Sequence, residues 1–276
     1  MTTTTLDIAI SHRVAVVWMA RETVRNAFNE ASIAELTETF TTLGADPDVR
    51  AIVLAGKGPA FCAGADLGWM KRMASFTHQE NRADALKLAT MLRTIYECPK
   101  PVIARVHGDA YAGGVGLVAA CDIAVAAIGA EFCLSETKLG LIPATIGPYV
   151  IRAMGANAAR RYFLTAEKFD SGEAFRLGLV HDLAPPEELD LRINALLGTL
   201  MQTSANAVSE SKRLVRELAD RPIDDAIVAD TAERIASIRT SDDGREGVRA
   251  FLEKRKPRWV VEYEAMAAQD GDDEEM

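Results

Sequence analysis

The chain has 276 residues, of which 49% are hydrophobic and 26% are charged. This composition indicates a globular protein with one large domain, or one domain with a helical appendage. No apolar run approaches the roughly 20 residues of a membrane span. The start, Met-Thr-Thr-Thr-Thr, lacks the basic and apolar regions of a signal peptide. We therefore expect a cytoplasmic protein with no membrane partner.

The formal net charge of −9 comes mainly from the C-terminal end. Seven acidic residues and no basic residue follow Arg258, and the remaining chain holds 31 basic and 33 acidic residues. We expect residues 260–276 to form a solvated, disordered acidic tail, and a docking peptide for a basic partner is the alternative. An acidic chain with no basic stripe is not expected to bind nucleic acid.

Cysteine and histidine spacing gives no sign of a metal centre. The four cysteines lie far apart without a C-x-x-C motif, and the four histidines have no metal-ligand spacing. We therefore expect no metal site and no disulfide framework, which fits a reducing compartment. The cysteines are Cys62, Cys98, Cys121 and Cys133, and the histidines are His12, His78, His107 and His181.

Strand, turn and helix signals alternate over the first part of the chain. Asn29 and the capping box Thr77-x-x-Glu80 predict helix starts, and Gly44 and Pro99 predict helix ends. Such alternation predicts an α/β fold with mostly parallel strands. In order, we expect a hairpin over 7–11 and 14–18, a helix over 30–43, a strand over 51–55, a helix from 78, a strand over 102–106, a helix over 113–121 and strands over 123–126 and 132–134.

From Thr145 onward the pattern becomes largely helical. Asp170-x-x-Glu173 is a candidate helix cap, and residues 178–183 are a brief extended return. No linker rich in Gly, Pro or Ser separates the two parts, so we expect an α/β core over residues 1–200 followed by a helical region over 201–259. The expected helices cover residues 156–164, 171–177, 186–203, 205–218, 222–238 and 244–254.

Three motifs carry the chemical signal. They are F-C-A-G-A-D-L over residues 61–67, a glycine-rich segment over 107–116 that leads to Cys121-Asp122, and L-S-E-T-K-L-G-L-I-P over 134–143. Small residues allow a ligand to approach the backbone and its N–H groups closely. Two such turns that converge on one oxygen make an oxyanion hole, and a nearby glutamate, here Glu136, can move a proton.

Each motif also has a plainer interpretation. Asp66 can be a helix cap, Gly114 can serve only close helix packing, and Asp122 is expected to be a structural cap or turn residue. Glu136 can be a solvated helix cap. Its place between an apolar strand and Leu-Gly-Leu-Ile-Pro instead favours a buried position, where desolvation would raise its pKa.

Taken in this order, the motifs resemble those of the crotonase (enoyl-CoA hydratase/isomerase) superfamily, over about residues 6–259. The stretches A-R-R-Y-F-L-T-A-E, residues 159–167, and F-L-E-K-R-K-P, residues 251–257, add to the resemblance. Within the superfamily, G-A-D-L-G-W-M and L-G-L-I-P-A-T-I-G-P-Y-V are most similar to bacterial methylglutaconyl-CoA and isohexenylglutaconyl-CoA hydratases.

The resemblance implies a crotonase-like spiral of ββα units with a helical C-terminal layer used for trimerisation, and trimers that can pair into hexamers. It implies an acyl-CoA thioester substrate and no further cofactor. The N–H groups of Ala65 and Gly113 would form the oxyanion hole, and Glu136 occupies the position of the family's second catalytic glutamate. The implied CoA-binding positions are Arg25, Ala27, Ala63, Ala65, Asp66, Leu67, Phe251 and Lys254, of which Phe251 and Lys254 are candidates to come from a neighbouring subunit.

One position departs from the family pattern, because Gly116 replaces the first catalytic glutamate of many hydratases. Three interpretations remain: a hydratase, most simply for a glutaconyl-type thioester; a Δ3,Δ2-enoyl-CoA isomerase that uses Glu136 alone; and a non-catalytic CoA-thioester binder. For the first, we expect the substrate's own carboxylate, or the space left at Gly116, to compensate. Candidate cations for that carboxylate are Lys71, Arg72 and Arg82.

Overall fold

The computed structural model describes residues 3–273, which divide into two compact units on either side of the boundary between Ala195 and Leu196. The first unit contains two sheets. The larger sheet consists of β1 (Leu6–Ser11), β2 (Val14–Met19), β3 (Ala51–Gly56), β5 (Val102–Val106), β7 (Ile123–Ala127) and β10 (Asp182–Ala184), in the order β1-β2-β3-β5-β7-β10. The smaller sheet, in the order β4-β6-β8-β9, consists of β4 (Ala60–Cys62), β6 (Asp109–Tyr111), β8 (Glu131–Cys133) and β9 (Lys168–Asp170).

Most strand pairs are parallel, as the alternation of elements predicted. Only the β1–β2 hairpin and the β8–β9 pair are antiparallel in the described residues. β3 is buried at every position, which is typical of a parallel strand covered on both faces. The larger sheet therefore lies in the apolar core of the unit, and the short strands of the smaller sheet form a separate, mostly parallel sheet.

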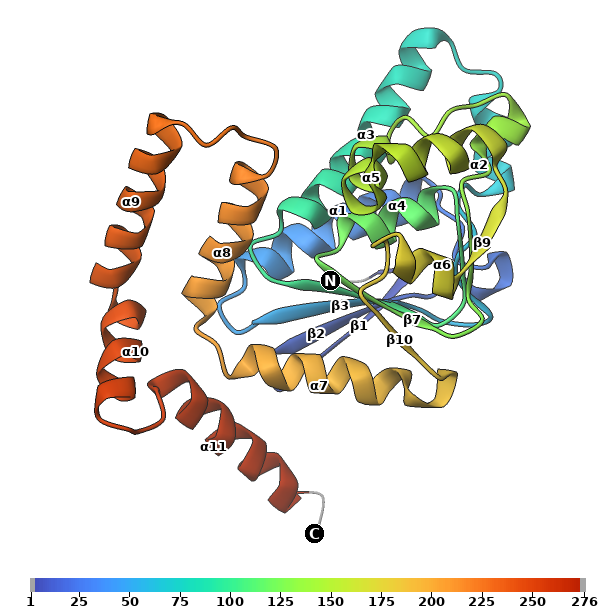
Figure 1. Ribbon diagram of the computed structural model, residues 1–276. Helices are drawn as coiled ribbons and strands as arrows, with labels where there is room; N and C mark the ends of the chain where they lie inside the picture. Colours follow the sequence, from blue (N-terminus) through green and yellow to red (C-terminus); the bar gives the residue numbers. More distant parts are fainter. Residues whose placement is uncertain (1–2, 274–276) are drawn as a thin grey trace. The chain divides into compact units, whose positions relative to one another are not determined.

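Helices of the first unit cover the larger sheet, and Figure 1 shows α1, α3, α4 and α5 on one of its faces. The helix α4 is buried along almost its whole length because its sequence, G-G-V-G-L-V-A-A, is apolar on all sides. The helices are α1 (Glu30–Ala45), α2 (Leu67–Met73), α3 (His78–Glu97), α4 (Gly113–Ala120), α5 (Gly147–Thr165) and α6 (Ser171–Arg176), with short 3₁₀ turns η1 (Glu22–Val24), η2 (Glu136–Leu139) and η3 (Pro186–Glu188).

Local capping signals set the helix starts. The Asn29 side chain accepts from the Ser32 N–H, Thr77 and Glu80 form the predicted capping box, and Asp170 accepts from the Glu173 N–H. All three caps are confirmed. Each consists of groups within three residues of one another, so the local sequence is enough to define them.

The C-terminal part is helical, as expected, and its helices are α7 (Leu189–Met201), α8 (Ala205–Leu218), α9 (Asp225–Thr240), α10 (Asp242–Leu252) and α11 (Arg258–Asp273). The tail differs from the sequence-based expectation. We expected disorder over 260–276, whereas α11 extends to Asp273 and residues 274–276 lie outside the described part. The sequence after Arg258 contains several good helix formers, including Glu and Ala, which outweigh the acidic composition locally.

Two glycines of α4 face atoms that leave no room for a side chain. A Cβ on Gly114 would lie 2.3 Å from the Cys62 carbonyl oxygen, and one on Gly116 would lie 2.2 Å from Cγ2 of Ile146. Gly114 therefore allows α4 to approach β4, which confirms the packing role considered for it. Gly116 allows the start of α5 to approach α4.

We predict that Gly116→Ala lowers the free energy of unfolding by about 1–3 kcal/mol, because the extra methyl group overpacks a buried contact. Gly198→Ala in α7 is the matched control, since a Cβ there meets nothing within 4 Å. That control should stabilise the helix by about 0.5–1 kcal/mol. Urea denaturation of both variants measures the difference, and equal stabilisation by both would contradict the packing argument.

Candidate functional site

The three sequence motifs meet at one edge of the smaller sheet. β4 pairs with β6 and β6 pairs with β8, all in parallel, so the carboxyl ends of these strands lie together. Ala65 comes three residues after the end of β4, Gly113 two residues after β6, and Glu136 three residues after β8. The fold therefore brings the three predicted catalytic residues to the same edge.

The turn after β4 and the N-terminus of α4 are in direct contact. A Cβ on Gly64 would lie 3.0 Å from the Tyr111 carbonyl oxygen, 3.1 Å from Cβ of Ala112 and 3.7 Å from the Gly113 nitrogen. A Cβ on Gly113 would lie 2.5 Å from the ring of Phe28. A side chain at Gly113 would clash with Phe28, and Gly64 has a φ of 89°, which residues with side chains rarely adopt, so glycine is favoured at both positions.

Both predicted donor groups are free of protein acceptors. Over the described residues, neither the Ala65 N–H nor the Gly113 N–H donates a hydrogen bond to another backbone group. Gly113 is the first residue of α4, where N–H groups have no intrahelical acceptor and carry partial positive charge. The arrangement can accommodate an anionic oxygen.

Ala112 precedes the second donor in a backbone conformation that L-residues rarely adopt, with φ 48° and ψ −116°. Its N–H donates to the Cys133 carbonyl at 2.7 Å, and its own carbonyl accepts from Val115 and Gly116. Hydrogen bonds on both sides thus hold the peptide that leads to Gly113. Strain of this kind typically costs 1–3 kcal/mol and tends to occur at functional sites.

Glu136 lies in η2 and is partly buried. Its Oε2 is fully buried and accepts no hydrogen bond from the described residues. Burial raises the pKa of this carboxyl group, opposed in part by the hydrogen bond from its own backbone N–H. A buried carboxylate oxygen without a partner is a costly arrangement, and it favours the proton-transfer role over that of a solvated helix cap.

The environment of Gly116 corrects one expectation. We expected Gly116 to leave space in place of the family's first glutamate, and this is wrong. Ile146, which is 2% exposed, occupies that volume with its side chain. Of the two glutamate positions that the resemblance implied, this chain therefore has the one at Glu136, and an apolar side chain lies where the other would be.

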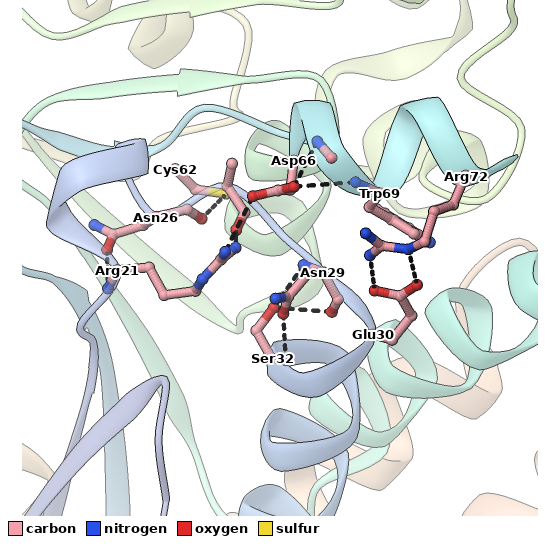
Figure 2. A network of polar contacts seen from close by, with 11 residues as sticks. Arg21, Asn26, Asn29, Glu30, Ser32, Cys62, Asp66, Trp69 and Arg72 are labelled. Carbon is pink, nitrogen blue, oxygen red and sulfur yellow. Dashed lines mark hydrogen bonds and ion pairs between the residues drawn. The ribbon is translucent and has the colours of Figure 1, made fainter. Parts of the chain in front are cut away.

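A polar network holds the turn after β4 in place (Figure 2). The Arg21 guanidinium donates to the Ala27 carbonyl and, at 3.0 Å, to Oδ2 of Asp66. Oδ1 of Asp66 accepts from the Gly68 and Trp69 N–H groups and caps α2. Asp66 is therefore both a helix cap and an ion-pair partner. These contacts lower the pKa of its carboxyl group, and the hydrogen bond from the Trp69 N–H contributes most.

Sequence reasoning missed Arg21 and Asn26. Asn26 is buried, and its amide nitrogen donates to the carbonyls of Lys57 and Ala60, both at 2.9 Å. The Arg25-Asn26 pair carried a weak signal, because Asn tolerates a left-handed backbone and both residues have positive φ. Nothing in the sequence pointed to Arg21, whose partner Asp66 is 45 residues away.

The other predicted site residues fall into three groups. Ala27 is buried, Ala63 is partly buried, and Arg25 and Leu67 are exposed beside the same turn. Asp122 accepts from the Val102 N–H at 2.7 Å, consistent with its expected structural role. Phe251 and Lys254 lie at the end of α10 in the second unit, where Phe251 is 83% exposed.

Of the three candidate cations, Arg72 already has a partner. Its guanidinium donates to both carboxylate oxygens of Glu30, at 3.1 and 2.6 Å (Figure 2). Lys71 and Arg82 are exposed. Within residues 3–273, no group of His, Cys, Asp and Glu is arranged to hold a metal ion, and no helix is long and apolar enough to cross a membrane.

We predict that Glu136→Gln stabilises the fold at neutral pH. The raised pKa means that the folded protein binds the Glu136 proton more tightly than the unfolded chain. This contribution is fully present below the unfolded pKa of about 4.5 and is lost as the pH rises through the folded value. The melting temperature of the variant should exceed that of the parent at about pH 8, with a smaller difference at about pH 4. Glu187→Gln controls for the loss of an exposed charge, and a pH-independent difference for Glu136→Gln would contradict the assignment.

Several known proteins are similar to this chain in sequence and in fold. The chain matches the family model for enoyl-CoA hydratase/isomerase over residues 9–262. It is 33% identical to a crotonyl-CoA hydratase from Syntrophomonas wolfei over 250 residues, 90% of this chain and 95% of that protein. The crystal structure of an enoyl-CoA hydratase from Shewanella pealeana has 41% identity and a TM-score of 0.90, covering 93% of this chain and 96% of that one. Pseudomonas aeruginosa AtuE has 34% identity and a TM-score of 0.89, covering 93% of this chain and all of that one. The chain therefore belongs to the enoyl-CoA hydratase/isomerase family and has the crotonase fold.

Proposed function

We propose that this protein is an enoyl-CoA hydratase, a lyase that adds water to an α,β-unsaturated acyl-CoA thioester. The observation that carries the proposal is the combination of two free N–H groups, on Ala65 and Gly113, with Glu136, whose Oε2 is buried and accepts no hydrogen bond from the described residues. The thioester oxygen would accept from both N–H groups. Preorganised donors of this kind stabilise the enolate-like charge and commonly contribute about 3 kcal/mol each.

One carboxylate is sufficient for the proton movements. Glu136 would take a proton from water while the water oxygen bonds to the β carbon and the electron pair of the double bond moves onto the thioester oxygen. Glu136 would then return that proton to the α carbon as the enolate collapses. The sum is one water added, with no proton left over. The raised pKa of Glu136 suits both the acceptance and the donation of a proton.

The same residues support a second candidate, a Δ3,Δ2-enoyl-CoA isomerase, because moving a proton between two carbons also needs only one carboxylate. Ile146 in the place of a water-activating group favours this alternative.

Incubation with crotonyl-CoA and, separately, with a 3-enoyl-CoA distinguishes the hydratase from the isomerase. Loss of the conjugated thioester absorbance in the first reaction indicates a hydratase, and its appearance in the second indicates an isomerase. Nanomolar CoA binding without either reaction would indicate the non-catalytic binder.

We predict that Glu136→Gln lowers kcat by at least about 100-fold, the usual scale for loss of a general acid–base group. The amide keeps the shape of the side chain, so KM should change little. Steady-state kinetics with the better of the two substrates measures both constants. Glu187→Gln is the control for an exposed carboxylate, and a Glu136→Gln variant with near-normal kcat would overturn the assignment.

For the acyl group, we propose a glutaconyl-type thioester such as 3-methylglutaconyl-CoA. The motifs that resemble glutaconyl-CoA hydratases support this, and we propose that the acyl end occupies a hollow between α3 and α5, which combines a cation with apolar walls. Its Tyr149 and Thr145 belong to the segment that follows Glu136, and Arg93 supplies the positive charge. The lining residues are Leu86, Ala89, Thr90, Arg93, Ala144, Thr145, Pro148 and Tyr149.

We predict that kcat/KM for 3-methylglutaconyl-CoA exceeds that for crotonyl-CoA by at least about tenfold, or roughly 1.4 kcal/mol. Arg93→Met, Lys71→Met and Arg82→Met, compared side by side, identify the cation, because only the variant that removes it should abolish the preference. Crotonyl-CoA turnover should survive in all three variants. Equal kcat/KM values for the two substrates in the unmodified protein would refute the glutaconyl assignment.

Substrate binding and assembly follow from the same proposal. The CoA nucleotide would lie along Arg25, Ala27, Ala63 and Leu67, with Phe251 and Lys254 of a neighbouring subunit completing its site. A homotrimer, or a pair of trimers, would supply that neighbour. The exposed apolar face of α10, formed by Val248, Phe251 and Leu252, supports such an assembly.

A further inference from the structure

Arg21 connects two segments that the proposed function uses for different purposes. Its Nη2 lies 3.0 Å from Oδ2 of Asp66, and its Nη1 donates to the Ala27 carbonyl. The side chains of Arg21 and Asp66 are only 20% and 15% exposed. A planar guanidinium that is largely shielded from water and uses two of its nitrogens at once fixes its partners more firmly than an exposed ion pair does.

The two segments are also joined through their backbones. The Phe28 N–H donates to the Gly64 carbonyl at 2.6 Å, the Asp66 N–H donates to the Phe28 carbonyl at 2.8 Å, and the Ala63 N–H donates to the Arg25 carbonyl at 2.9 Å. These bonds lie on both sides of Ala65. Residues 25–28 are therefore directly hydrogen-bonded to the segment that contains Ala65.

Residues 25–28 do not hold this shape by themselves. Arg25 and Asn26 both have left-handed backbones, with φ of 52° and 56°, and neither is glycine. Arg21 supports the segment twice more, because its N–H donates to Oδ1 of Asn26 at 3.0 Å and its carbonyl accepts from the Asn26 N–H at 2.9 Å. An unfavourable conformation of this kind persists only when its surroundings determine it.

We infer that Arg21 is a positioning residue that couples the CoA-binding segment 25–28 to the oxyanion donor Ala65. The inference rests on the proposed function. When CoA occupies residues 25–28, part of its binding energy would act through Arg21 to hold the Ala65 N–H toward the thioester oxygen. Binding energy from a remote part of a substrate can raise kcat only if such a connection to the reacting centre exists. A displacement of about 1 Å at that centre can cost about 100-fold in rate.

The test compares Arg21→Met with Arg105→Met. Arg105 is the control, because its side chain is similarly shielded, at 13% exposed, and donates to both oxygens of an aspartate, Asp190, at 2.6 and 2.8 Å, although Asp190 itself is 69% exposed. Arg21→Met should lower kcat for the enoyl-CoA substrate by at least about tenfold, or roughly 1.4 kcal/mol. Arg105→Met should keep kcat within about twofold, even where both variants lose similar melting temperature. Arg21→Lys, which can reach one partner but not both, should restore kcat in part.

A second readout separates coupling from simple loss of structure. The unmodified protein should turn over the enoyl-pantetheine thioester, which lacks the nucleotide, with a kcat lower than that for the enoyl-CoA. In Arg21→Met the two kcat values should converge, because binding of the nucleotide would no longer affect the position of Ala65.

If Arg21→Met proves unfolded by circular dichroism, Asp66→Asn replaces it, since that change removes the ion pair and keeps Oδ1 as the cap of α2.

The possible outcomes separate a failure of the coupling role of Arg21 from a failure of the proposed enoyl-CoA hydratase function. If the unmodified protein turns over enoyl-CoA and Glu136→Gln does not, but Arg21→Met keeps kcat and the kcat difference between the two thioesters, the coupling inference is overturned and the proposed function stands. If the unmodified protein turns over no enoyl-CoA, the proposed function falls, and the coupling inference falls with it. A selective fall in kcat together with converging kcat values supports the inference.

Discussion

The close approach of the 62–66 turn to the N-terminus of α4 is the constraint on which the site depends. No side chain fits at Gly64, Gly113 or Gly114, because each Cα faces backbone or ring atoms at 2.3–3.1 Å from where a Cβ would stand. In the proposed reaction, the N–H groups of the turn and of the helix would bind the same oxygen. The two segments follow the paired strands β4 and β6, and α4 is buried along almost its whole length.

This geometry leaves several polar groups without protein partners. Buried polar groups are normally hydrogen-bonded, and each exception needs an explanation. Here a buried carboxylate oxygen occurs at the same sheet edge as two free N–H groups on partly buried residues and a strained alanine. The proposed chemistry explains all of them, because a thioester oxygen would satisfy the N–H groups and a water or substrate proton would satisfy Glu136. The free protein bears that cost, and the folding energy for it comes from the apolar core of the larger sheet.

The sequence predicted those parts of the fold that depend on near neighbours. Caps at Asn29, Thr77 and Asp170 were evident because donor and acceptor lie within one helical turn. The order of the motifs also predicted that Ala65, Gly113 and Glu136 belong together. Contacts across long sequence separations were not evident. The Arg21–Asp66 pair is one example, and the filling of the Gly116 site by Ile146 is another. Both depend on which loops the fold brings together, and a single sequence does not record that.

Gly116 and Ile146 are best understood as one feature. A glutamate at 116 would need the volume that the Ile146 side chain now occupies, and a smaller residue at 146 would leave a cavity beside the present glycine. The two positions are therefore coupled, and neither can change alone without overpacking or a void. The absence of the family's first glutamate has been accommodated by packing. Under the proposed mechanism, Glu136 would therefore carry the whole proton-transfer task, and the reaction would depend more strongly on rigid placement of the Ala65 and Gly113 N–H donors.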